Sequence, residues 1–304
     1  MSSHHTLRGV YAAAVTPLKP DGTIDNDALP KYLGFLAKRG CHGALLLGTT
    51  GEGPSFSAAE RLELLRAAML VRQQHPGLRI LAGTGTPSME ETASLTRAAF
   101  DLGVDGVVVL PPYYFKKVSD DGLFDWYRQV IVRAVPAGGY LLAYHIPPVT
   151  GITISFDLIA RLKEAFPEKF AGLKDSSGDG EHARKLGQLF GKDLLVMNGN
   201  DRLFSLALQS QASGCITALA SLASPLLRRV WDHASRGEQD GETQRRLNAA
   251  RDVLDTFPPA AAFIKEILHS QYHFPSWGVR RPLTQLQQAL AEQAAQRWAQ
   301  LNHV

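Results

Sequence analysis

Cysteine is scarce in this chain of 304 residues, which contains only Cys41 and Cys215. Two cysteines cannot form a disulfide framework, and both lie in apolar surroundings, so we expect small core residues rather than redox or metal ligands. Long apolar runs are also missing, and residues 1–6 lack the apolar segment of a secretory signal. These absences predict a cytoplasmic protein with no membrane partner.

A strong excess of one charge is missing too. The 32 Lys and Arg against 29 Asp and Glu give a formal net charge of +3, and the basic residues are scattered, which argues against a nucleic-acid partner. The chain lacks a P-loop, zinc-spaced Cys and His residues and a Gly-x-Ser-x-Gly elbow. Residues 83–87 have no third glycine for a dinucleotide fingerprint. Residues 21–27 lack the closing glutamate of a calcium loop, so we interpret them as a turn.

The main pattern that is present is an alternation of short apolar runs with segments of helical periodicity. Hydrophobic residues make up 45% of the chain, enough for a substantial core. We expect strands at residues 10–16, 44–48, 79–83, 106–110, 140–144, 170–174, 194–197 and 215–217. Strands that alternate with helices imply a parallel sheet, and this many in roughly 230 residues favour a closed (β/α)8 TIM barrel over an open sheet.

Helix signals fill the gaps between these strands. Asp27 is placed to cap the first helix and Gly40 to end it, while Ser57 and Glu60 form a capping-box pattern. After Pro225 only helical patterns remain, with expected spans at 225–235, 239–256, 259–270 and 284–300. We therefore divide the chain into a barrel, residues 1–235, and a C-terminal helical extension, residues 236–304, in which no independent chemistry is visible.

The segment 170–177 carries the most informative chemical signal. A run of small and apolar residues leads to Lys174, and a turn follows at once. This pattern indicates a buried strand whose last inward position is an amine. Burial favours the neutral, nucleophilic form of a lysine, which is the form that makes an imine with a keto substrate. Taken alone, such a segment more often marks a strand-end lysine that extends to solvent.

Other expected strands also end in polar groups, and the C-terminal strand ends of such barrels form the active site. The second strand ends in the turn 48–53, whose threonines and backbone N–H groups suit a carboxylate or phosphate. Further strand ends carry Tyr113 with Tyr114, Tyr144 with His145, and Asn198 to Asp201. Each feature alone is often structural. Their common placement predicts a site that binds a small 2-keto acid, forms an imine and transfers protons.

Three motifs in the sequence are similar to those of a known family. Gly48-Thr-Thr-Gly-Glu52, Tyr144-His-Ile-Pro-Pro-Val-Thr-Gly151 and Gly172-Leu-Lys-Asp-Ser-Ser-Gly178 resemble the signatures of the dihydrodipicolinate synthase/N-acetylneuraminate lyase family. Their order and spacing agree with the family, and the resemblance covers essentially the whole chain. As a set, the motifs are highly specific.

The resemblance implies catalytic roles for four residues. Lys174 matches the lysine that forms an imine with pyruvate, and Tyr144 matches the phenol that transfers protons at the reacting carbon. Thr49 matches the hydroxyl that links this phenol to a second tyrosine, here Tyr114. In the family the second tyrosine comes from a neighbouring subunit, which implies at least a dimer and commonly a homotetramer of paired dimers.

The resemblance also implies how the substrate is held. Thr50, with the backbone of the loop that Gly48 opens, matches the grip on the pyruvate carboxylate. Ile216 matches a strand-eight position that lines the pyruvate pocket, and we add Gly199, at the end of the seventh strand, to the substrate-binding set. The resemblance implies no metal and no organic cofactor, because the iminium itself accepts the electrons.

Departures from the family motifs bear on the second substrate. Dihydrodipicolinate synthases usually carry an arginine where this chain has Val149, and the loss of a bidentate partner would leave a carboxylate on the aldehyde poorly paired. Sialic acid lyases usually have a glutamate after the match to Asp201 and a serine on strand eight, where this chain has Arg202 and Ala218. Arg202 suits either an acid group of the substrate or a surface helix start.

These observations lead to one main expectation and three alternatives. We expect a class I, Schiff-base lyase that splits a 2-keto-3-deoxy or 4-hydroxy-2-oxo acid into pyruvate and an aldehyde. The alternatives within the family are the condensing synthase, which uses pyruvate and aspartate semialdehyde, and a keto-acid dehydratase. An alternative of another class is a non-catalytic barrel that binds small acids, although such a barrel would not need both Lys174 and Tyr144.

Overall fold

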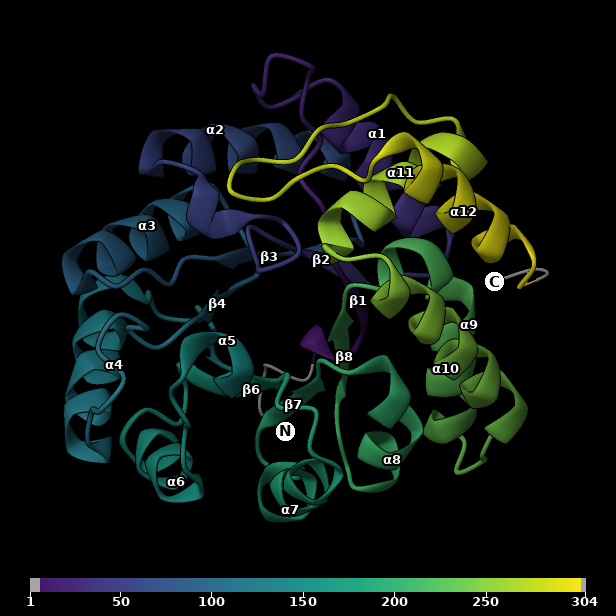
Figure 1. Cartoon of the computed structure of the whole chain (residues 1–304). Helices are drawn as coiled ribbons and strands as arrows, with labels where there is room; N and C mark the ends of the chain where they lie inside the picture. The colour runs from purple at the N-terminus through teal and green to yellow at the C-terminus, as the bar shows by residue number, and fades with distance from the viewer. Residues whose placement is uncertain (1–5, 302–304) are drawn as a thin grey trace.

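The computed structural model describes residues 6–301 and contains a closed barrel of parallel strands that pair in chain order, from β1 to β8 and back to β1 (Figure 1). The strands are β1 (Gly9–Ala13), β2 (Gly43–Leu46), β3 (Arg79–Gly83), β4 (Gly106–Val109), β5 (Leu141–His145), β6 (Phe170–Asp175), β7 (Leu195–Asn198) and β8 (Gly214–Thr217). The predicted (β/α)8 barrel is therefore confirmed. Residues 1–5, part of the segment in which we predict no secretory signal, lie outside the described range.

The strands bury both faces, which explains their nearly continuous apolar sequences. One set of side chains fills the inside of the barrel; it includes Tyr11, Leu45, Leu81, Val108, Leu142, Tyr144, Ala171, Leu195, Met197 and Ile216. The other set points outward and forms a larger core with the helices. Cys41 and Cys215 lie in this outer core as buried free thiols, as predicted.

A ring of helices surrounds the strands (Figure 1). The helices up to β8 are α1 (Ala28–Lys38), α2 (Ala58–Met69), α3 (Met89–Asp101), α4 (Asp120–Ala134), α5 (Pro147–Thr150), α6 (Phe156–Ala165), α7 (Gly180–Phe190) and α8 (Phe204–Gln209), with short 3-10 turns η2 (Gly53–Ser55), η3 (Leu70–Gln73) and η4 (Asp201–Leu203). Within residues 6–301, none of the helices combines the length and apolar character that crossing a bilayer requires.

Of the two predicted N-terminal cap signals, the one at Ser57 is confirmed and the one at Asp27 is not. Ser57 and Glu60 form the expected capping box at α2, with the Glu60 N–H donating to Ser57 Oγ at 3.3 Å and the Ser57 N–H to Glu60 Oε2 at 2.9 Å. The cap predicted at Asp27 is wrong, because the Asp27 side chain makes no capping hydrogen bond. Asp25 accepts the N–H of Ala28 at 3.2 Å instead. Asp27 has helical angles (φ −77°, ψ −31°), whereas a capping residue typically has an extended backbone.

The chain after β8 is helical, as expected. It forms α9 (Ala220–Ser235), α10 (Gly241–Thr256), α11 (Ala260–Tyr272) and α12 (Gln288–Ala299), and the last three group on one side of the barrel, near α9 and α1 (Figure 1). Helix α9 starts before the predicted residue 225, because a kink at Ala223 (φ −115°, ψ 25°) places Pro225 in the first turn of the straight part. The boundary expected after residue 235 falls at the end of α9, and its status as a domain boundary stays a prediction.

Candidate active site

Lys174 and Tyr144 face each other inside the barrel. They are partners in the register of the adjacent parallel strands β6 and β5. Lys174 Nζ lies 4.1 Å from the centroid of the Tyr144 ring, and the two residues are only 3% and 4% exposed. The barrel therefore brings together the two residues with the main predicted catalytic roles, with the amine inside the barrel rather than extended to solvent.

A β-bulge directs Lys174 inward. The register between β5 and β6 shifts at Leu141 and Leu142, opposite Gly172. Ala171 lies in the inner core and Leu173 in the outer core, although residues two apart in a regular strand share a face. Gly172 adopts the backbone conformation that the bulge requires, with φ +146°. A Cβ at this position would lie 2.1 Å from the backbone oxygen of Leu195. The bulge reverses the alternation of inward and outward side chains, so Lys174, the residue after Leu173, points into the barrel towards Tyr144.

Polar neighbours change the acidity of the Tyr144 phenol. Thr49 Oγ1 lies 3.4 Å from Tyr144 Oη. Burial raises the pKa of Tyr144, but the charge of Lys174 and hydrogen bonding with Thr49, Lys174 and Ser176 outweigh burial, so the pKa falls below its usual value. Ser176 was not among the expected site residues; its position two residues after Lys174 in the turn is the signal that could have identified it.

The loop 48–53 forms a compact turn beside this pair. The N–H of Glu52 donates to the Thr49 carbonyl and the N–H of Gly53 to the Gly48 carbonyl, both at 3.1 Å. Within residues 6–301, the amide N–H groups of Thr49, Thr50 and Gly51 donate to no backbone carbonyl. Successive amides without protein partners are the feature that anion-binding turns share, so the anion site expected from the glycine-rich sequence stays a prediction.

The two remaining predicted substrate positions differ in their surroundings. Ile216, on β8, is fully buried in the inner core. Gly199, directly after β7, donates its N–H to the Asp175 carbonyl at 2.7 Å, and a Cβ there would lie 2.0 Å from Ser176 Oγ. A side chain at residue 199 would therefore displace Ser176, so the glycine is required by the packing of the turn after Lys174.

Tyr114 is the predicted catalytic residue that the fold does not bring to the others. It is 74% exposed and packs edge-to-face on Phe115, itself 71% exposed, with ring centroids 5.2 Å apart. Within residues 6–301, no hydrogen bond joins Tyr114 to Thr49 or Tyr144. A direct role of Tyr114 therefore needs a second copy of the chain.

A small pocket adjoins the inner end of the loop. Its cavity volume is only about 10 Å³, and it is lined by Leu45, Leu47, Gly48, Gly53, Pro54, Arg61, Gly83, Gly85, Val108, Leu110 and Tyr144. Arg61, on α2, is a buried residue of this wall that the sequence pattern did not indicate. Burial lowers the pKa of Arg61, and its Nε donates to the Phe56 carbonyl at 3.1 Å. The wall of this pocket is therefore mostly apolar, with one buried cation.

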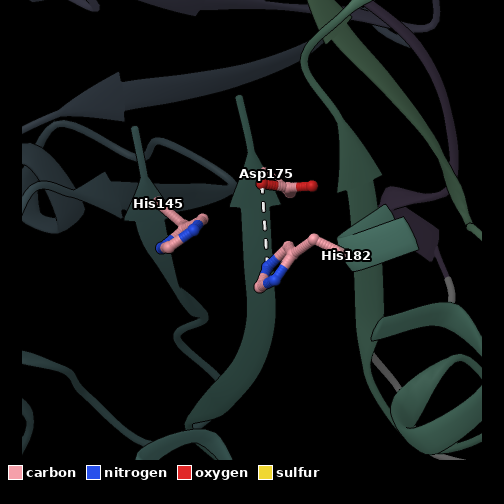
Figure 2. A group of neighbouring side chains, drawn as sticks. All are labelled: His145, Asp175 and His182. Atoms are coloured by element: carbon pink, nitrogen blue, oxygen red, sulfur yellow. Dashed lines mark ion pairs between the residues drawn. The ribbon is translucent and has the colours of Figure 1, made fainter. Parts of the chain in front are cut away.

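On the outer side of β5 and β6, His145, Asp175 and His182 form a group that resembles a metal-ligand set (Figure 2). His182 Nε2 lies 4.0 Å from Asp175 Oδ1, and the rings of His145 and His182 stack with centroids 4.7 Å apart and planes at 17°. A metal ion lies in the plane of each ligating imidazole, and nearly parallel stacked planes share no such point close to the rings. His145 Nδ1 also accepts the Ile154 N–H at 3.1 Å. The group therefore packs the strand behind Lys174 rather than holding an ion.

The fold places Arg202 outside the site. Its guanidinium donates to Asp252 at 2.5 Å and Asp255 at 2.7 Å, both on α10. The preceding Asp201 is fully buried and pairs with Arg251 at 3.0 Å. The suggestion that Arg202 meets an acid group of the substrate is therefore not supported, and the surface helix-start interpretation fits these contacts.

The closed barrel, with the buried Lys174–Tyr144 pair and the loop 48–53 at the strand ends, is the architecture of (β/α)8 barrel enzymes. Comparison with known proteins assigns the family. A family model described as the dihydrodipicolinate synthetase family matches residues 6–300. The chain belongs to this family. An uncharacterised DapA-like lyase of Chloroflexus aurantiacus is 42% identical over 92% of this chain and 92% of its own length.

Two solved structures extend the comparison. The dihydrodipicolinate synthase of Agrobacterium tumefaciens has a TM-score of 0.85 and 32% identity, and the match covers 97% of this chain and 99% of that one. A prophage protein of the dihydrodipicolinic acid synthase family from E. coli K12, solved in complex with pyruvate, has a TM-score of 0.90 and 24% identity, covering 98% and 99%. The second similarity shows the fold alone. Members of the family are lyases, so this protein is a lyase.

Proposed function

We propose that this lyase splits a 2-oxo acid, such as a 2-keto-3-deoxy sugar acid or a 4-hydroxy-2-oxo acid, into pyruvate and an aldehyde through an imine on Lys174. The observation that carries the proposal is the buried Lys174 amine, 4.1 Å from the ring of Tyr144 at the strand ends. A buried amine next to a phenol supplies both the nucleophile and the proton carrier for this reaction.

The proposed reaction follows from these two groups. Lys174 Nζ attacks the keto carbon, the Tyr144 phenol protonates the leaving hydroxyl, and loss of water leaves an iminium and the Tyr144 phenolate. The Tyr144 phenolate removes the proton of the 4-hydroxyl group, the C3–C4 bond breaks, and its electrons move to the iminium nitrogen to give an enamine while the aldehyde leaves. Tyr144 returns the proton to C3, and water releases pyruvate. The lowered pKa of Tyr144 supports this role, because it increases the share of phenolate.

The loop 48–53 is the proposed site for the carboxylate of the keto acid. The amide N–H groups of Thr49, Thr50 and Gly51, together with the Thr50 hydroxyl, are suited to a carboxylate next to the keto carbon. We assign Ile216 and Gly199 to the wall around the bound pyruvate unit. This arrangement would orient the keto carbon towards Lys174.

Val149 bears on the aldehyde half of the substrate. It lies on α5, just after β5, and is 58% exposed, so it offers an apolar surface rather than a partner for a carboxylate. We therefore favour an uncharged or sugar-like aldehyde. The condensing synthase is the second candidate, because a 4-hydroxy-tetrahydrodipicolinate synthase of Kosmotoga olearia is 31% identical over 86% of this chain.

Tyr114 enters the proposal through a second copy of the chain. The exposed rings of Tyr114 and Phe115 would be covered in a dimer, in which Tyr114 reaches Thr49 of the partner and continues the proton path from Tyr144. We propose a homotetramer of two such dimers. Light scattering coupled to size-exclusion chromatography tests the number of subunits. A monomer would remove Tyr114 from the proton path.

Reductive trapping with borohydride tests the central step. Incubation with pyruvate and borohydride should add one reduced pyruvate unit to the intact mass, and peptide mapping should place it on Lys174. Lys174→Met is the control and should give no adduct. Assays with a panel of aldehydes and 2-oxo acids then distinguish cleavage, condensation and dehydration as the reaction. Turnover of aspartate semialdehyde with pyruvate would favour the synthase, and loss of water without cleavage would favour a dehydratase. No adduct with any keto acid would overturn the proposal and favour a non-catalytic acid-binding barrel.

A further inference from the structure

A buried ion pair links the loop 48–53 to the C-terminal extension. Lys265, on α11, places its Nζ 2.5 Å from Glu52 Oε1, although the two residues are 213 positions apart in the chain. Their side chains are 1% and 0% exposed. Glu52 belongs to the loop proposed to hold the substrate carboxylate, whereas Lys265 lies outside the barrel.

Both charged groups have further hydrogen-bond partners. The backbone N–H of Arg280 donates to Glu52 Oε2 at 2.5 Å, and Lys265 Nζ donates to the Gly278 carbonyl at 2.6 Å. Each Glu52 oxygen therefore accepts a hydrogen bond from the extension. The Arg280 guanidinium adds an ion pair with Glu60 at 2.5 Å and lies 4.8 Å from the centroid of the Phe56 ring. The segment that carries Gly278 and Arg280 thus holds the loop and the start of α2 together.

The backbone of the loop needs such support. Glu52 has φ +58°, in the left-handed region that residues other than glycine seldom adopt. The same loop is held on its other side by Thr16, whose hydroxyl donates to the Gly51 carbonyl at 2.8 Å. Thr49 and Thr50 lie three and two residues before Glu52, so a shift of Glu52 would move their amide N–H groups.

Stability alone does not account for this pair. Two charges taken out of water lose their hydration, and a buried ion pair is often no more stabilising than apolar residues of the same volume. Burial lowers the pKa of Lys265, with the charge of Glu52 acting against burial. What the pair supplies, and apolar residues would not, is a fixed direction for the Glu52 side chain and hence for the loop backbone.

We propose that Lys265 is a positioning residue of the active site: through Glu52 it holds the loop 48–53 in the conformation that receives the carboxylate of the 2-oxo acid. The C-terminal extension thereby supplies part of the substrate site. This inference rests on the proposed function of the loop, but the conformational part can be measured without substrate.

The test uses the double variant Glu52→Gln/Lys265→Met in the full chain, because it removes both buried charges at nearly constant volume and leaves neither one unpaired. Arg202→Met is the control, since it breaks a different link between the barrel and the extension, the one to Asp252 and Asp255. Two quantities are compared with the wild type. One is hydrogen exchange of the amides in residues 48–53 without substrate. The other is the pyruvate concentration that half-saturates borohydride trapping.

We expect exchange in the loop to become at least about tenfold faster and the half-saturating pyruvate concentration to rise by about tenfold, with adduct formation at saturation nearly unchanged. The control should change neither quantity. A folded double variant with wild-type exchange and half-saturation would overturn the inference. A double variant that does not fold would assign the pair to stability and overturn it as well. If the wild type forms no adduct, the proposed function fails, while hydrogen exchange still decides whether the pair orders the loop.

Discussion

Lys174 Nζ lies 4.1 Å from the centroid of the Tyr144 ring, and the two residues are direct partners on neighbouring strands of the barrel. The backbone register thus sets the distance between the amine and the phenol, with no flexible loop between them. Sites built on strands hold their side chains more accurately than sites on loops.

Replacing Tyr144 by Phe should remove proton transfer while keeping the fold. We expect the cleavage rate to fall by about 10²- to 10⁴-fold, because a positioned acid–base group contributes that much. Pyruvate trapping on Lys174 should still occur. Tyr127→Phe is the control: this buried phenol lies in the outer core and donates to the Val109 carbonyl at 3.1 Å, so its loss should cost about 1 kcal/mol of stability and leave the rate unchanged. A Tyr144→Phe variant with wild-type turnover would exclude Tyr144 from catalysis.

Replacing Gly172 by Ala should damage both stability and activity. The new Cβ would lie 2.1 Å from the Leu195 backbone oxygen, at a φ of +146°. We expect a loss of about 2–4 kcal/mol in the free energy of unfolding, from the strained backbone and the overpacked strand, and little trapping on Lys174. Gly138→Ala is the control, since its φ is +74° but no atom lies within 4 Å of the added Cβ. It should cost only about 1–2 kcal/mol. Denaturant titration measures both, and equal costs would contradict the role of the bulge.

The pH dependence of stability should report on His145. Burial, and then the charge of His182, lower the pKa of His145 from 6.5 to about 4. The unfolded chain therefore takes up a proton between about pH 6.5 and pH 4 that the folded chain does not, so this contribution to stability is present above pH 6.5 and is lost as the pH falls to about 4. His145→Asn keeps an acceptor for the Ile154 N–H but does not titrate. Between pH 6.5 and about pH 4, the unfolding free energy of this variant should fall by on the order of 2–3 kcal/mol less than that of the wild type. Parallel curves for the two proteins would contradict the shifted pKa.

Arg202→Met should leave catalysis unchanged. The residue pairs with Asp252 and Asp255 at the surface, so we expect a stability change of about 1 kcal/mol or less. The KM for every acidic substrate tested should stay within about twofold of the wild type. A large rise in KM for acidic substrates alone would return Arg202 to the substrate site.

Much of the fold was predictable because it depends on local patterns. The apolar runs and cap signals placed β3 at the predicted residues and α2 with its capping box, since strand and helix periodicity act over a few neighbouring residues. The errors came from local competition: Asp25 rather than Asp27 meets the first free N–H of α1, and a kink lets α9 begin before Pro225.

Parts of the site were not predictable because they depend on partners far apart in the chain. Glu52 appeared in the sequence only as part of the turn 48–53 and of the first family motif. Lys265 was only a polar position in an apolar helix of the extension, where we expected no chemistry. Their pairing appears only when the extension folds back on the loop. Ser176 near Tyr144 and His182 against Asp175 likewise depend on side-chain directions that strand and helix periodicity does not specify.

The sequence by itself determined the barrel, the placement of Lys174, Tyr144 and Thr49 at strand ends, and the resemblance to the family, because alternation and motif spacing are properties of consecutive residues. The tertiary structure alone decided that the bulge at Gly172 turns Lys174 inward, that the Tyr114 ring packs on Phe115 and stays exposed, and that Lys265 pairs with Glu52. These depend on the register between strands and on contacts across the closed barrel, which form only when the whole chain packs together.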